Sequence, residues 1–128
     1  MRIYVDASAA AKLLTFEDET PALKSFLVTA EEHIFVSAVL LETELRRTAL
    51  RKGVPQADVS ALLAGIDLID LPRAVFQQAG LLPVEGLRSL DALHLASAMR
   101  VESAALLAYD HRLLAAADAV GLSTFTPV

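Results

Sequence analysis

The first six residues constrain the fold more than any other part of the chain. Ile3, Tyr4 and Val5 form a short β-branched and aromatic run that ends at Asp6, and an alanine-rich helical segment follows without a loop. A strand that leads directly into a helix is the first half of a βαβ unit. Because ligands bind beyond the carboxyl ends of strands in open parallel sheets, Asp6 is predicted to lie at a functional edge.

The rest of the chain repeats this alternation. Strands are predicted at residues 33–36, 66–71, 104–108 and 123–125, and helices at 22–31, 38–52, 55–64, 72–81, 90–102 and 110–120. Ser37 and Ser89 are interpreted as caps of the helices that follow them, and Gly53 as the end of the first of these two helices. The pattern predicts a three-layer α/β/α fold with a central, mainly parallel sheet of about five short strands.

Composition limits the class of protein. The 128 residues fit one domain spanning 1–128, and the absence of cysteine excludes disulfides and thiolate metal sites. No apolar run is long enough to cross a membrane, so a soluble cytoplasmic protein is expected. The net charge of -5 argues against general electrostatic coating of nucleic acid. The hydrophobic fraction of 55% predicts an apolar surface that meets a partner or a second copy.

Four acids are candidates for chemistry at the predicted edge. Asp6, Asp91 and Asp110 each stand at or near the start of a predicted helix, where an acid can equally serve as a cap. Glu44 lies inside a predicted helix, beside its apolar stripe, where capping cannot explain it; the alternative is an ordinary ion pair with Arg47 or Arg51. Glu42 points elsewhere and has Arg46 four residues on as a surface partner.

Carboxylates that converge need protons or a cation. Two of them ~4 Å apart repel by about 4 kcal/mol at an effective dielectric constant of 20. An all-oxygen set of ligands suits a hard ion, Mg²⁺ or Mn²⁺, and such an ion can activate water and stabilise the oxyanions of phosphodiester hydrolysis. Ser8 can orient a carboxylate or a metal-bound water, or act only as a first-turn hydroxyl.

Several histidines and basic residues have simpler interpretations. For His94, a hydrogen bond to Asp91 on the same helix face is favoured over a catalytic role. His33 and His111 are interpreted as peripheral. A basic cluster near the end of its helix can complement the helix dipole or hold an RNA backbone near Glu44; its members are Arg46, Arg47, Arg51 and Lys52. Arg112, beside Asp110, can also hold an RNA backbone.

Four stretches carry a family resemblance when their order and spacing are taken together. They read I-Y-V-D-A-S-A, S-A-V-L-L-E-T-E-L-R-R, S-L-D-A-L-H-L-A-S-A and L-L-A-Y-D-H-R-L, and the last is followed by an alanine-rich helix ending in Gly-Leu. The chain resembles PIN-domain ribonucleases, specifically the VapC-type toxins of bacterial toxin–antitoxin pairs. The resemblance covers nearly the whole sequence.

The resemblance implies an activity, a site and partners. It implies a PIN-like fold and Mg²⁺-dependent endonucleolytic cleavage of RNA, with Mn²⁺ as a substitute ion. The implied catalytic acids are Asp6, Glu44, Asp91 and Asp110, and the implied metal ligands are Asp6, Asp91 and Asp110. It also implies a homodimer and a VapB-like antitoxin that covers an apolar groove among the first helices.

One departure and two alternatives qualify this interpretation. Many family members carry Thr or Ser two residues before the fourth acid, where this chain has Ala108, so the part of Asp110 in metal binding is open. A catalytically silent PIN-like interaction module is one alternative, and Glu44 argues against it. Phosphoryl transfer through an aspartyl-phosphate on Asp6 is the other, but Ser8 stands where such sites usually have a second acid.

Overall fold

A computed structural model describes residues 1–128 and has five strands and seven helices. In chain order the elements are β1 (Arg2–Val5), α1 (Ala7–Leu14), α2 (Thr20–Thr29), β2 (Ile34–Ala38), α3 (Leu40–Lys52), α4 (Gln56–Leu63), β3 (Asp67–Ile69), α5 (Arg73–Gly80), α6 (Ser89–Arg100), β4 (Ala105–Leu107), α7 (His111–Ala119) and β5 (Thr124–Phe125).

The sheet is parallel throughout, with the strand order β3-β2-β1-β4-β5. In β1, Tyr4 pairs with Val36 of β2 on one side and with Leu106 of β4 on the other. Because all strands run the same way, their carboxyl ends lie along one edge. The predicted α/β/α class with about five strands is confirmed.

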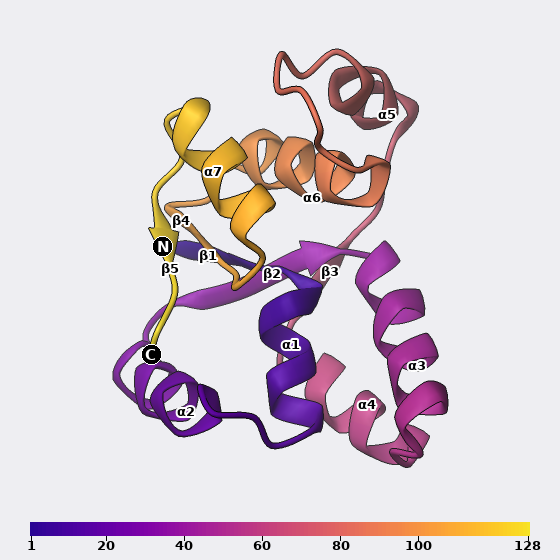
Figure 1. Ribbon diagram of the computed structural model, residues 1–128, viewed down its shortest axis with the longest axis vertical. Helices are drawn as coiled ribbons and strands as arrows, with labels where there is room; N and C mark the ends of the chain where they lie inside the picture. Colours follow the sequence, from indigo (N-terminus) through magenta and orange to yellow (C-terminus); the bar gives the residue numbers. More distant parts are fainter.

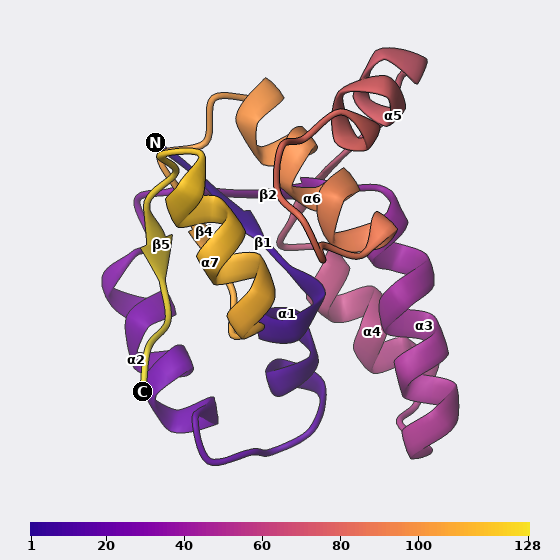
Figure 2. The same ribbon diagram turned by 45° about the horizontal axis from the view of Figure 1, so that its top comes forward.

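Helices cover both faces of the sheet, with α5, α6 and α7 on one side and α1 to α4 on the other (Figure 1). The turned view keeps the same two layers and shows β5 and the C-terminus beside α2 (Figure 2). The rings of Phe26 and Phe125 meet there at 4.9 Å between centroids.

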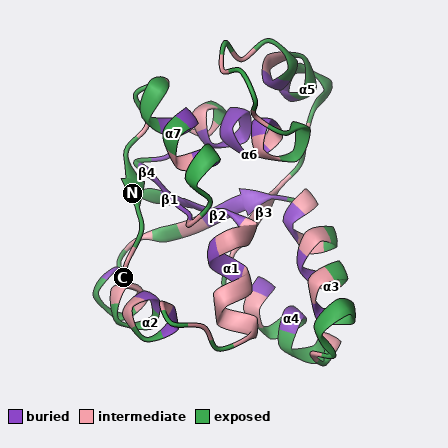
Figure 3. Cartoon of the chain, viewed as in Figure 1, coloured by how far each residue is buried: buried purple, intermediate pink, exposed green.

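Alternation along β1 divides the core between these layers. Ile3 and Val5 pack with α1, α3 and α4, whereas Tyr4 packs with α6 and α7. Nearly all of β1 and β4 is buried, and many of the exposed residues lie on the outer helix faces and in the connecting segments (Figure 3). A central strand with helices on both faces has to be apolar on both sides, as β4 is with its sequence Ala-Leu-Leu.

Helix boundaries follow local chemistry at some positions and not at others. Asp6 and Asp110 cap α1 and α7 with their side chains, and Gly53 ends α3 in a left-handed conformation at φ 69°. The predicted cap at Ser37 is wrong: Ser37 belongs to β2, and its hydroxyl donates to the Val5 carbonyl at 2.7 Å. The predicted cap at Ser89 is also wrong, because Ser89 is the first residue of α6 and makes no capping bond.

None of the helices combines the length and the apolar character that a membrane crossing requires.

Candidate functional site

Asp6 occupies the point where β1 becomes α1. Its Oδ2 atom accepts from the Ser8 backbone N–H at 3.1 Å and from the Ser8 hydroxyl at 2.7 Å. The residue is only 3% exposed, and its Oδ1 atom has no hydrogen-bond partner. A buried acceptor without a donor is rare, so Oδ1 is suited to bind a cation or a donor that the protein itself does not supply.

Ser8 connects Asp6 to the end of β4. Its hydroxyl donates to Asp6 and accepts from the Tyr109 backbone N–H at 2.9 Å. The hydroxyl therefore does more than occupy a first helical turn, since it joins the segments after two neighbouring strands. Ala108 lies within that second segment, and its carbonyl accepts from the Thr126 hydroxyl at 3.1 Å.

Asp91 and Asp110 border one surface cleft. Asp91 lies in the first turn of α6, and Asp110 precedes α7 and accepts from the Leu113 N–H at 3.0 Å. The capping role considered for Asp110 is thus present, but it engages Oδ1 alone. The two acids line a cleft together with three basic side chains, Arg88, His111 and Arg112.

Glu44 reaches the same region from α3, through His94. His94 Nε2 donates to Glu44 Oε1 at 2.6 Å, and His94 Nδ1 lies 2.7 Å from the Tyr4 hydroxyl. The Tyr4 hydroxyl in turn accepts from the backbone N–H of Ala38 at 2.9 Å. We call this series, from Ala38 through Tyr4 and His94 to Glu44, the buried hydrogen-bond chain.

The charges of the other three acids act on Asp91. Burial raises the pKa of the Asp91 carboxyl, and the charges of Asp6 and Asp110, with a smaller part from Glu44, raise it further. Burial alone lowers the pKa of the His94 imidazole, but Glu44 and Asp6 outweigh this, and the pKa lies above its usual value. Burial also raises the pKa of the Tyr4 hydroxyl, which keeps its proton.

The chemistry of these side chains suits a hard divalent cation. Asp6, Asp91 and Asp110 offer carboxylate oxygens, and the free Oδ1 of Asp6 is an acceptor that only a cation or a donor can satisfy. As they lie, no three acidic or histidine side chains are close enough to hold one ion together. The fit to such an ion thus rests on the donor type of these residues and on the unpaired Oδ1 of Asp6, and not on an assembled cluster of ligands.

The structure alters several interpretations made from the sequence. His94 does not bond to Asp91; it faces the core and binds Tyr4 and Glu44. Glu44 consequently pairs with His94, and neither Arg47 nor Arg51 is its partner. The expected pair of Glu42 and Arg46 forms at 3.0 Å.

Three residues near the acids were not recognised in the sequence as parts of the site: Tyr4, His94 and Arg88. The sequence pattern indicates an ordinary strand residue at Tyr4 and a loop residue at Arg88. For His94 a signal was present, since a histidine amid the apolar residues of α6 needs a buried polar partner. That partner is 50 residues away in sequence, and local spacing does not reveal it.

Comparisons with known proteins agree with this fold. The PIN domain family model matches residues 3–119. Ribonuclease VapC47 of Mycobacterium tuberculosis is 38% identical over 131 residues, covering 98% of this chain and 96% of the relative. Ribonuclease VapC46 of the same species is 40% identical over 129 residues, covering 98% and 97%.

A solved structure is similar over the whole chain. VapBC2 from Rickettsia felis, bound to a DNA fragment from their promoter, superposes with a TM-score of 0.79 at 13% identity and covers 100% of both chains. At that identity the likeness concerns the fold alone. The family assignment rests on the domain match and on the full-length relatives. The chain belongs to the PIN-domain family, and its curated relatives within that family are VapC ribonucleases.

Proposed function

We propose that this protein is a VapC-type toxin, an Mg²⁺-dependent endoribonuclease that hydrolyses RNA phosphodiester bonds in the cytoplasm, with Mn²⁺ as a substitute ion. Divalent-metal dependence is general among PIN-domain VapC ribonucleases. The observation that carries the proposal is the unpaired, buried Oδ1 of Asp6 beside three further acids at the carboxyl edge of the sheet.

Each acid has a distinct part in the proposed site. Asp6 and Asp91 would hold the ion, and Asp110 would contribute the oxygen that its helix cap leaves free. Glu44 adds negative charge and an acceptor for the proton of an attacking water. Ser8 fixes Oδ2 of Asp6 and leaves Oδ1 without a hydrogen-bond donor. When bound, the ion supplies Lewis-acid stabilisation of the phosphate and activation of water.

The cleft beside Asp91 and Asp110 suits an RNA backbone. Arg112 and Arg88 are exposed there and present cations next to the acids, so they are the proposed phosphate contacts. Arg46 is a weaker candidate than its sequence position implied. Its guanidinium already donates to Glu42 at 3.0 Å, to Gln56 at 3.0 Å and to Ser60 at 3.2 Å. Arg47 is exposed and stays a candidate.

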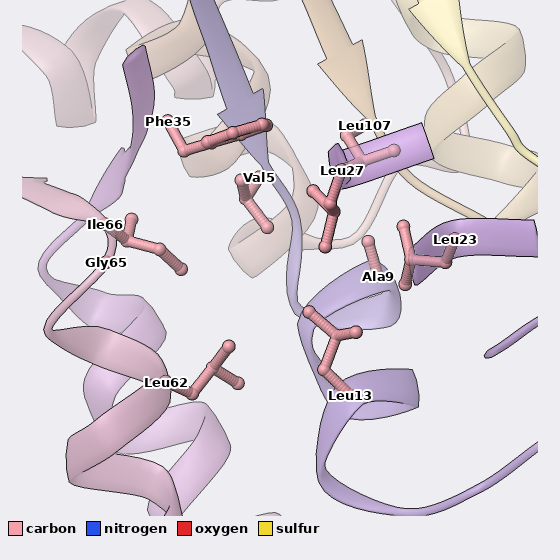
Figure 4. A pocket seen from close by; sticks show the side chains of 10 residues that line it. All are labelled: Val5, Ala9, Leu13, Leu23, Leu27, Phe35, Leu62, Gly65, Ile66 and Leu107. Carbon is pink, nitrogen blue, oxygen red and sulfur yellow. The ribbon is translucent and has the colours of Figure 1, made fainter. Parts of the chain in front are cut away.

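An apolar cavity on the opposite face of the sheet is the proposed seat of a VapB-like antitoxin. It has a volume of about 210 Å³, and nine of its ten lining residues are hydrophobic. Side chains from β1, α1, α2, β2, α4 and β4 converge on it (Figure 4). An amphipathic helix of a partner buries its apolar face in such a groove.

The resemblance also leads us to propose a homodimer, which sedimentation velocity tests directly.

Incubation of the purified protein with a mixed RNA pool tests the activity. The arms contain Mg²⁺, Mn²⁺ or a chelator, and the variants are Asp6→Asn and Glu44→Gln. Asp118→Asn is the matched control, because it removes an exposed acid from the far end of α7. We expect fragments that require the ion, disappear in both site variants and persist in the control.

The alternative is a catalytically silent PIN-like module that only binds another protein. Intact RNA with either ion, or fragments from the site variants equal to those from wild type, would favour this alternative.

The antitoxin assignment has its own test, which is co-purification with the product of a small reading frame adjoining the gene. Leu62→Glu, at the wall of the cavity, is expected to abolish that co-purification and to leave RNA cleavage unchanged.

A further inference from the structure

The buried hydrogen-bond chain is not explained by packing alone. His94 and Tyr4 are both 0% exposed, and their rings meet edge to face with centroids 5.6 Å apart. Apolar side chains would fill this space between α6 and the sheet without any need for hydrogen bonds. The polar chain instead runs from the Ala38 amide at the end of β2 to the partly exposed carboxylate of Glu44 on α3.

Glu44 needs such a support. It is a flexible side chain in the middle of α3, 21% exposed, and the bond to His94 is the one side-chain hydrogen bond that its carboxylate makes. A glutamate loses substantial rotamer entropy when it is held in one place. Without the imidazole, nothing in the surrounding structure would keep this carboxylate turned toward the other acids.

The imidazole also stands beside Asp6. Its Nε2 lies 4.0 Å from the unpaired Oδ1 of Asp6, beyond hydrogen-bond distance, while it bonds to Glu44 at 2.6 Å. The Nδ1 bond to Tyr4 fixes the rotation of the ring in either protonation state, because the hydroxyl can donate to a bare nitrogen or accept from a protonated one. The ring thus directs its Nε2–H to Glu44 and leaves Oδ1 free.

We propose that His94 is a positioning residue of the acidic site, which holds the Glu44 carboxylate in place with an imidazole that Tyr4 fixes to the sheet. The inference rests on the proposed function, since it assigns His94 a part in that same site. Removing a residue that orients a ligand behind a metal site typically lowers metal affinity or activity by about 10–100-fold. His94 acts through Glu44 and does not itself touch RNA or the ion.

Two substitutions separate positioning from simple core packing. His94→Gln places an amide N–H near the position of Nε2 and preserves a donor for Glu44. His94→Asn reaches only the position of Nδ1, near Tyr4, and leaves Glu44 without a donor. Both replace the ring by a smaller amide, so a role in packing alone predicts similar losses. Leu95→Val is the control, since it perturbs the buried neighbour on α6 and leaves the hydrogen-bond chain intact.

Three quantities are measured for each protein: kcat and KM on a cleavable RNA with saturating Mn²⁺, the dissociation constant of Mn²⁺ without RNA by electron paramagnetic resonance, and the unfolding midpoint. For His94→Asn we expect kcat to fall by about 10–100-fold, KM for RNA to stay within about twofold, and Mn²⁺ binding to weaken several-fold. His94→Gln should retain most of both properties, and Leu95→Val should resemble wild type.

Equal losses in the two His94 variants, or losses that only follow the unfolding midpoint, would overturn the inference. If wild type leaves RNA intact, the proposed function fails. The Mn²⁺ dissociation constants by themselves then test the positioning role, and equal constants for His94→Asn and His94→Gln count against it.

If both His94 variants fail to fold, Tyr4→Phe removes only the hydroxyl that fixes the ring. It should lower kcat and weaken Mn²⁺ binding without a change in KM. A Tyr4→Phe protein that matches wild type in both properties would likewise overturn the inference.

Discussion

The face of the sheet under α6 and α7 carries a buried polar chain, whereas the face over α1 to α4 carries an apolar cavity of about 210 Å³. Neighbouring residues of β1 serve the two sides, with Tyr4 in the polar chain and Val5 at the cavity wall. Buried side chains fill the sheet face under α6 and α7, whereas strand residues on the other face line a cavity. By the alternation of its side chains, one short strand thereby separates the hydrogen-bond chain behind the proposed active site from the proposed seat of the antitoxin.

Leucine truncation on β4 tests this contrast in packing and has the largest expected effect. Leu106 and Leu107 are both buried, but Leu106 faces the α6–α7 core and Leu107 lines the cavity. Leu106→Ala should lower the free energy of unfolding by about 3–5 kcal/mol, and Leu107→Ala by about 2–3 kcal/mol, because a side chain beside a void has fewer contacts to lose. Urea unfolding of both variants measures the difference, and equal losses would mean that the two faces are packed alike.

Asp91→Asn tests whether the acidic edge is arranged for chemistry at the expense of stability. RNA cleavage should fall at least about 100-fold, which corresponds to about 2.7 kcal/mol of transition-state stabilisation. In chelator, by contrast, the fold should become more stable at neutral pH, because the substitution removes a charge that burial and the other acids disfavour.

The pH dependence gives an independent check on Asp91. Burial, with Asp6 and Asp110, raises the pKa of its carboxyl, so between about pH 4 and that raised pKa the folded state binds more protons than the unfolded state. In chelator, wild-type stability should therefore fall as the pH rises through this window. Asp91→Asn should lack this component in thermal melts, and identical pH profiles would contradict the electrostatic account.

Ser8→Ala probes the edge with a smaller expected effect. The substitution removes the 2.7 Å bond to Asp6 and the acceptor for the Tyr109 N–H. We expect about a tenfold loss of kcat and a loss of about 1 kcal/mol in the free energy of unfolding. Ser8→Thr keeps the hydroxyl and should recover cleavage. Loss of stability with full activity would make Ser8 a structural residue only.

Lys12→Met should have the smallest effect and concerns the other side of α1. The Lys12 amine lies 3.2 Å from Glu17 and 2.9 Å from Glu19, and Lys12 holds the pKa of Glu19 below its usual value. A depressed carboxyl pKa stabilises the fold above the unfolded-state pKa and loses this effect as the pH falls. Wild type should thus melt slightly above the variant at pH 7, and the gap should narrow on acidification below about pH 4. A gap that does not depend on pH would assign the effect to the contact of Lys12 with the Tyr109 ring.

Much of the site was predictable because its acids stand at points that local sequence marks. Asp6 directly follows β1, Asp110 stands between β4 and α7, and Glu44 interrupts the apolar side of a helix, so the sequence pattern drew attention to them. Ser37 shows the limit of such reasoning. A serine between a strand and a helix is typical of a cap, but here β2 continues through it because its hydroxyl finds the Val5 carbonyl across the sheet.

The sequence by itself determined the parallel α/β/α architecture and indicated the four candidate acids, since both depend on patterns within a few neighbouring residues. Only the tertiary structure decided which face of α6 is buried, and hence that His94 turns from Asp91 toward Tyr4, 90 residues away, and Glu44, 50 residues away. It also decided that Arg46 is engaged by α4 and that Arg88 joins the acids. The physical reason is that a helix's periodicity defines its faces, whereas the partner of each face depends on how distant segments pack together.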